Sequence, residues 1–176
     1  VIEDWPDLQY RGFMLDISRN FTSKDNILKF IDLLAHYKMS VFHLHFGDDE
    51  GWRLEIPEFP ELVTFGAYHA FPHRNDNGEY VEVECLLPSY NGSVDPTDMT
   101  SSANGHLSKE DYIEILKYAW ERRISVIPEF DTPGHSRAAI KAMEAYAART
   151  GDTSYLLSEP EDKSKYMSVQ YYTDNA

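Results

Sequence analysis

The fold is decided between residues 13 and 46, in two apolar runs that flank a helical pattern. The runs are Phe13-Met14-Leu15-Asp16-Ile17 and Val41-Phe42-His43-Leu44-His45-Phe46. Each is nearly continuous in apolar residues, which is typical of a strand covered on both faces. Between them Ser23 is a suitable N-cap, and apolar side chains recur at helical spacing at Ile27, Phe30, Ile31, Leu34 and Tyr37. The pattern predicts a βαβ unit.

A second strand–helix alternation follows residue 105. Ser108 and Asp111 form a capping-box-like helix start, and the expected apolar face of this helix is Tyr112, Ile113, Leu116, Ala119 and Trp120. A third strand is predicted at Ser125-Val126-Ile127-Pro128-Glu129-Phe130, and a further helix from near Pro133 to about Arg149. Residues 47–105 are expected to form a long irregular excursion with a short strand near residues 79–85.

This alternation predicts the α/β class, with a parallel sheet and right-handed crossovers. Two architectures fit, an open doubly wound sheet and a (β/α) barrel. No G-x-G-x-x-G or Walker pattern follows a strand, which weakens a nucleotide-binding interpretation.

Composition excludes several classes of function. Lys and Arg total 16 against 30 Asp and Glu, a net charge of −14, which argues against nucleic acids and anionic membranes as partners. No apolar run reaches the roughly 18 residues of a membrane span. The single Cys85 excludes an internal disulfide framework and a multi-cysteine zinc site.

Ionisable residues collect where each predicted strand ends, the edge at which α/β folds place their sites. Asp16 leads to Arg19, the second strand leads to Asp48-Asp49-Glu50, and Glu129 leads to Asp131 and His135. Charged groups are costly to bury unless they are paired, so the three clusters together point to a functional site.

The histidines leave alternatives open. His43 and His45 face the same side of a strand and with His135 are candidate ligands of a metal-dependent hydrolase; hydrogen-bonded structural histidines are the plainer interpretation. At a helix start, the helix dipole disfavours protonation of His135 while Asp48 or Asp131 favours it. Such a histidine suits an acid–base support role near neutral pH.

Three motifs resemble the family 20 glycoside hydrolases, the β-N-acetylhexosaminidases. They are Arg11-Gly12-Phe13-Met14-Leu15-Asp16-Ile17-Ser18-Arg19-Asn20-Phe21, His43-Leu44-His45-Phe46-Gly47-Asp48-Asp49-Glu50-Gly51-Trp52-Arg53 and Pro128-Glu129-Phe130-Asp131-Thr132-Pro133-Gly134-His135. They occur in the family's order. The excursion, with Leu86-Leu87-Pro88-Ser89-Tyr90 and Ser102-Ala103-Asn104-Gly105, resembles that of gut-type bacterial members.

The resemblance implies a (β/α)8 TIM barrel that hydrolyses terminal β-linked N-acetylglucosamine or N-acetylgalactosamine with retention, by substrate-assisted catalysis. It implies that Arg19 binds the 3- and 4-hydroxyls of the sugar, and that Asp48 and His135 form a relay to the catalytic Glu. His45, Asp49 and Glu129 would support them. No cofactor and no metal are implied, and the partner is a glycan substrate.

The sequence departs from the family at its catalytic pair. The fourth-strand motif of the His-x-Gly-Gly-Asp-Glu type, which carries the proton donor and the acetamido-orienting Asp, does not occur. A barrel needs about 250 residues, so residues 1–176 are expected to be an N-terminal portion: about three βα units of a partial TIM barrel, with the long excursion after strand two.

Three further expectations follow from this interpretation. Alone, the 176 residues should be inactive. They should tend to associate through exposed barrel edges. The parent protein is expected to be exported in a bacterium, because glycan-trimming bacterial enzymes tend to be exported. A metal-dependent hydrolase and a non-catalytic carbohydrate-binding module remain the alternatives.

Overall fold

The sheet at the centre of the molecule has three parallel strands in the order β1–β2–β5. The structure, a computed structural model, describes residues 1, 3–67, 73–74, 77, 80–81, 104–132 and 134–156. The three strands are β1 (Gly12–Asp16), β2 (Val41–Gly47) and β5 (Ser125–Phe130). Their parallel pairing confirms the predicted α/β class and all three predicted strands.

Two helices cover one face of this sheet, α1 (Lys24–His36) and α3 (Lys109–Glu121). Ion pairs from Lys24 to Asp111 and Glu114 and a hydrogen bond from Tyr118 to Asp32 join the two helices. The core lies between helices and sheet, and its fully buried members include Ile27, Ile31, Phe42, Leu44, Phe46 and Ile115.

Both helix starts lie where the sequence predicts them, but their caps differ. Ser108 accepts a hydrogen bond from the backbone of Asp111 and completes a capping box, whereas Ser23 makes no side-chain cap bond. The expected apolar face of α3 was partly wrong. Ile115 is buried, while Leu116 is 36% and Trp120 is 80% exposed.

The prediction that β1 is covered on both faces, which its apolar run suggested, was also wrong. Phe13 and Met14 are 45% and 44% exposed because β1 is an edge strand with helices on one face only. Residue partners across the sheet share a face, so Met14, His43 and Ile127 form one row on the uncovered side. Asp16, His45 and Glu129 form the next row.

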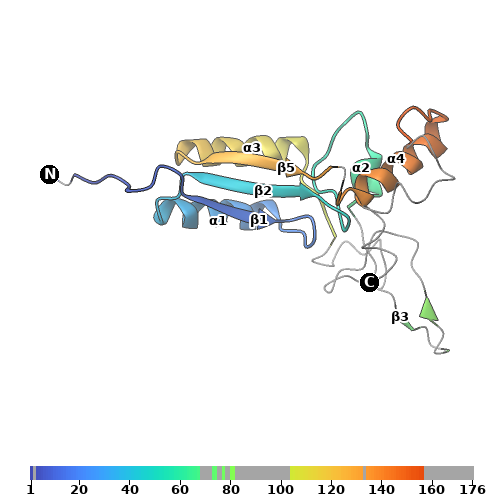
Figure 1. Cartoon of the computed structure of the whole chain (residues 1–176), viewed down its shortest axis with the longest axis horizontal. Coiled ribbons are helices and arrows are strands. Elements are labelled where there is room, and N and C mark those ends of the chain that lie inside the picture. Colours follow the sequence, from blue (N-terminus) through green and yellow to red (C-terminus); the bar gives the residue numbers. More distant parts are fainter. Residues whose placement is uncertain are drawn as a thin grey trace.

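The remaining elements lie beyond the carboxyl ends of the strands (Figure 1). They are α2 (Glu61–Thr64), α4 (Arg137–Thr150) and the antiparallel pair β3 (His73–Arg74) and β4 (Tyr80–Val81). The sequence did not predict α2, and α4 begins later than expected from Pro133. Of the predicted short strand at 79–85, only Tyr80 and Val81 are described, and residues 86–90, 102 and 103 lie outside the described residues.

Candidate functional site

A row of ionisable side chains crosses the sheet at the carboxyl ends of its strands. Asp16, His45 and Glu129 are paired residues of β1, β2 and β5. Glu129 Oε2 lies 2.6 Å from Nε2 of His43 and 3.1 Å from Nδ1 of His45. The register of β2 against β5 then shifts between His45 and Gly47, and irregularities of this kind commonly re-aim side chains beside active sites. The row brings three of the predicted residues together.

Asp48 is the centre of the site. It is 1% exposed, and its Oδ2 accepts a hydrogen bond at 2.8 Å from Nε2 of His45 and lies 2.7 Å from Nη2 of Arg19. Its Oδ1 accepts the backbone N–H of Asp49 at 2.7 Å and lies 3.3 Å from Nδ1 of His135. Burial alone would raise the pKa of Asp48, but these partners lower it. Asp48 is therefore held ionised by groups from three parts of the chain.

The partners of Asp48 respond in the opposite sense. Burial lowers the pKa of His45, yet its hydrogen bond to Asp48 and the nearby charges of Asp16 and Glu129 leave that pKa raised. Burial likewise opposes the charge on Arg19, but Asp16, Asp48 and Glu50 raise its pKa. In both residues the surrounding carboxylates favour the charged form over the neutral form.

Arg19 is positioned by a turn at the end of β1. Oδ1 of Asp16 accepts the backbone N–H groups of Ser18 at 2.9 Å and of Arg19 at 3.1 Å, which is a turn that Asp side chains favour. The second oxygen of Asp16 accepts a hydrogen bond from Nη1 of Arg19 at 2.6 Å. The side chain of Arg19 remains 43% exposed. A planar guanidinium held this way suits binding of neighbouring hydroxyls.

His135 lies on the opposite side of Asp48, in the turn before α4. Its φ is +55°, a left-handed conformation that is uncommon for a residue other than glycine. The turn is fastened by Asp49, whose Oδ1 accepts the backbone N–H of Arg137 at 2.9 Å at the start of α4. Burial raises the pKa of Asp49 in spite of that bond. Asp49 therefore supports His135 by holding the helix start rather than by facing solvent.

Arg53 is a buried residue that the sequence did not single out for a role. It is 0% exposed and donates hydrogen bonds to three backbone carbonyls, those of Ser18, Ala67 and Gly105. Burial lowers the pKa of Arg53 to about 9. Ser18 directly precedes Arg19 in the chain, and Ala67 and Gly105 stand on either side of residues 68–104. Arg53 thus holds Ala67 and Gly105 to the turn that positions Arg19.

Two groups of side chains have the composition of a metal site. They are His45, Asp48 and Asp131, and Asp48, Asp49 and His135, with ligand atoms within 4.8 Å of one another in each group. Among the residues described, His43 belongs to neither, so the predicted set of His43, His45 and His135 is not brought together. Because Nη2 of Arg19 is 2.7 Å from the Asp48 carboxylate that both groups share, its charge would repel a divalent cation there.

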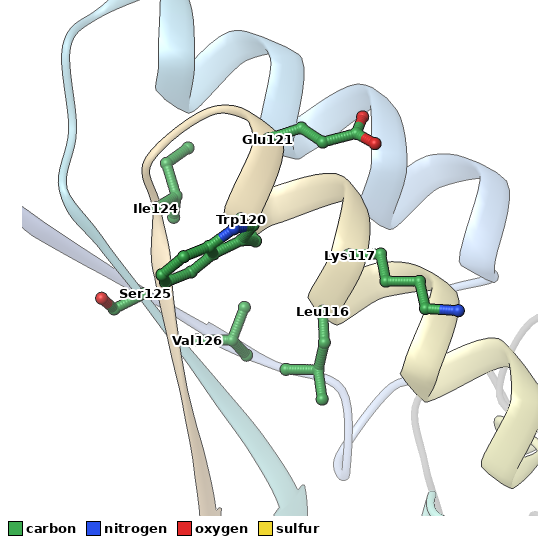
Figure 2. A pocket seen from close by; sticks show the side chains of 7 residues that line it. All are labelled: Leu116, Lys117, Trp120, Glu121, Ile124, Ser125 and Val126. Carbon is green, nitrogen blue, oxygen red and sulfur yellow. The ribbon is translucent and has the colours of Figure 1, made fainter.

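A hollow lies away from these residues, at the amino end of β5 (Figure 2). It has a volume of about 530 Å³ and is lined by Leu116, Lys117, Trp120, Glu121, Ile124, Ser125 and Val126. Its walls are apolar with one Lys and one Glu, and none of them belongs to the row at the carboxyl ends. The hollow and the Asp48 network are therefore separate features of the molecule.

Among the residues that the structure describes, none of the helices is both long and apolar enough to cross a membrane.

Known proteins share the sequence of this chain over most of its length. The family described as "Glycosyl hydrolase family 20, catalytic domain" matches residues 8–176. A "Beta-hexosaminidase" of Vibrio vulnificus is 45% identical over 99% of this chain and 20% of its own length, and an "N,N'-diacetylchitobiase" of Vibrio harveyi is 48% identical over 97% of this chain and 19% of its own. The chain thus spans about one fifth of the length of these curated relatives.

Solved structures show the same relationship. The GH20 exo β-N-acetylglucosaminidase from Vibrio harveyi, in complex with N-acetylglucosamine, matches with a TM-score of 0.65 and 37% identity. The match covers 81% of this chain and 20% of that one. A β-N-acetylhexosaminidase from Bacteroides fragilis matches at 0.60 and 32%, over 81% of this chain and 24% of that one. With the family match over residues 8–176, this establishes that the chain belongs to glycosyl hydrolase family 20.

Proposed function

We propose that the whole protein is a retaining exo-β-N-acetylhexosaminidase that removes terminal β-linked N-acetylglucosamine or N-acetylgalactosamine. The observation that carries the proposal is the buried Asp48 carboxylate, which contacts Arg19, His45 and His135 together. A sugar-binding cation and an acid–base relay are thereby coupled through one residue. The names and the sequence identity of the relatives support the substrate class.

Each predicted residue has a role in this proposal. Arg19 binds the 3- and 4-hydroxyls of the terminal sugar, and its partly exposed side chain is accessible for that contact. Asp48 and His135 form the relay that positions the proton donor and tunes its pKa. His45, Asp49 and Glu129 hold the relay: His45 through its bond to Asp48, Glu129 through His45, and Asp49 through the start of α4.

The reaction is substrate-assisted. The acetamido oxygen of the sugar attacks the anomeric carbon, the glycosidic bond breaks, and a Glu protonates the leaving oxygen. Water then opens the oxazolinium-like intermediate and restores the β configuration. The catalytic Glu and the Asp that orients the acetamido group have no counterpart in this sequence. The proposal therefore places them in the rest of the whole protein, with residues 1–176 as an N-terminal portion of its (β/α)8 barrel.

Turnover of a chromogenic N-acetylglucosaminide tests the proposal. The whole protein should hydrolyse it, whereas the 176-residue chain alone should not. In the whole protein Arg19→Ala should raise KM, because the hydroxyl contacts are lost, and the matched surface variant Arg122→Ala should leave KM unchanged. Absence of turnover by the whole protein, or turnover by the chain alone, contradicts the proposal.

Two further predictions remain attached to this function. Export of the protein to the periplasm, the cell surface or the medium is proposed from the substrate class alone. Self-association is proposed through the edge strands β1 and β5, where Phe13 and Ile127 are 45% and 43% exposed. Fractionation of the source cells tests the first, and sedimentation of the chain tests the second.

A further inference from the structure

The guanidinium of Arg19 faces a different carboxylate at each of its three nitrogens. Nη1 lies 2.6 Å from Asp16 and Nη2 lies 2.7 Å from Asp48, while Nε lies 3.5 Å from Oε2 of Glu50. Because the guanidinium is planar and rigid, the group that faces Nε limits rotation of the whole plane. Asp16 and Asp48 have their roles in the turn and the relay. Glu50 has none in the proposed function.

We propose that Glu50 is a positioning residue for the terminal sugar, which holds the Nε edge of Arg19 so that the guanidinium meets the sugar hydroxyls in one fixed orientation. This inference rests on the proposed function and adds a residue to which the resemblance gives no role. Glu50 acts through Arg19 and needs no contact of its own with the substrate.

The surroundings of Glu50 support this role. Its Oε2 is buried and has no hydrogen-bond partner within the part of the chain that the structure describes, although the side chain as a whole is 24% exposed. Asp16 and Asp48, by contrast, accept hydrogen bonds from backbone N–H groups. A buried carboxylate oxygen without a hydrogen bond is costly. Arg19, whose Nε lies 3.5 Å away, is the cation that faces this oxygen.

The charge of Glu50 changes near neutral pH. The charged groups that act on it are Asp48 from the same turn, Arg19 from the turn after β1, and Arg53 from the segment that follows. Burial, and then the charge of Asp48, raise the pKa of Glu50 to about 7. Below that pH the protonated group shares a hydrogen bond with Asp48, and above it the carboxylate attracts Arg19. Arg19 should therefore be held best above pH 7.

The experiment compares the wild-type whole protein with Glu50→Gln, Glu50→Asp and the exposed control Glu58→Gln. Values of kcat and KM for the chromogenic N-acetylglucosaminide are measured from pH 5.5 to 8.5. We expect the wild-type KM to fall about three- to tenfold as pH rises through about 7. In Glu50→Gln, KM should stay at the acidic-limb value with kcat within about twofold of wild type. Glu50→Asp should recover part of the pH dependence, and Glu58→Gln all of it.

Calorimetry with N-acetylglucosamine at pH 6 and pH 8 gives a second readout that needs no turnover. Weaker binding by Glu50→Gln at pH 8 but not at pH 6 supports the inference. If the wild type turns over and Glu50→Gln keeps the wild-type profile of KM, the inference is wrong while the proposed function stands. If the protein binds the sugar with this pH dependence but does not hydrolyse the glycoside, the role of Glu50 is supported and the proposed hydrolase function is wrong. Absence of both binding and turnover removes both.

Discussion

The two faces of the β1–β2–β5 sheet use alternate residues of the same strands for opposite purposes. Phe42, Leu44 and Phe46 point to the helix-covered face, where each is 0% exposed. On the other face His43 lies between the half-exposed Met14 and Ile127, and the next row is ionisable throughout. The period of two along β2 thus separates packed apolar side chains from ionisable ones within a single strand.

The ionisable face also differs in how its charges are used. On the outer surface of the helix layer, Arg122 pairs with Asp32, whose side chain is 53% exposed. At the carboxyl ends of the strands, Asp48 and His45 pair while 1% and 2% exposed. Exposed pairs contribute little to stability. Removing one partner of a buried pair, by contrast, leaves the other charge buried without compensation. Substitutions on the two faces should therefore affect different measurements.

The largest effect on stability is expected from the covered face. Phe42→Ala should lower the free energy of unfolding by about 3–5 kcal/mol, because it leaves a cavity beneath α1. Met14→Ala, one row along on the uncovered face, should cost clearly less, since Met14 is already 44% exposed. Urea unfolding of both variants measures the difference. Equal losses would mean that the two faces are packed alike.

The largest effect on catalysis is expected from the uncovered face. In the whole protein, Asp48→Asn keeps the shape of the side chain but removes the charge that His45, Arg19 and His135 share, and kcat/KM should fall about 10²–10³-fold. The control Asp32→Asn removes an acid of the helix layer and should leave kcat/KM unchanged. A similar decrease in both variants would show that the loss reflects folding and not the relay.

A smaller effect is expected at Glu50, where substitution should stabilise the folded protein at high pH instead of destabilising it. Its pKa is raised from 4.5 to about 7 in the folded protein, so the folded state binds this proton more tightly than the unfolded chain does. Its contribution to stability is complete below pH 4.5 and is lost as pH rises to about 7. The Gln side chain of Glu50→Gln does not titrate. The unfolding free energy of the variant minus that of the wild type should therefore be about 1–3 kcal/mol larger at pH 8 than at pH 4.5. Thermal unfolding across this pH range measures the gain, and a constant difference between the two proteins would contradict it.

The smallest effect is expected in the helix layer itself. Ser108→Ala removes the capping box of α3 and should cost about 1 kcal/mol of unfolding free energy without changing KM. Ser23→Ala is the matched control, because Ser23 makes no side-chain cap bond, and its cost should be smaller. The pair is compared by urea unfolding, and a larger loss for Ser23→Ala would refute the assignment of the caps.

Much of this arrangement was predictable because strands and helix starts are local patterns. The apolar runs located β1, β2 and β5, and the polar residues that follow them located the site at one edge of the sheet. The neighbours of each side chain were less accessible. The facing of Glu50 toward Arg19 depends on the path of the chain after the bulge in β2. The exposure of Trp120 depends on which elements cover α3, and the left-handed backbone of His135 depends on how Asp49 fastens α4. These are tertiary features that residue spacing does not encode.

The hydrogen bonds of Arg53 bear on how the chain tolerates insertions. Its guanidinium binds the carbonyls of Ala67 and Gly105 as well as that of Ser18, so a single side chain holds these two positions to the turn before Arg19. Lengthening a segment whose ends are already held together changes the entropy of loop closure only slowly. A change in the number of residues between Ala67 and Gly105 should therefore leave the turn before Arg19 in place. In engineering terms, Ala67 and Gly105 are the natural junctions for exchanging this segment.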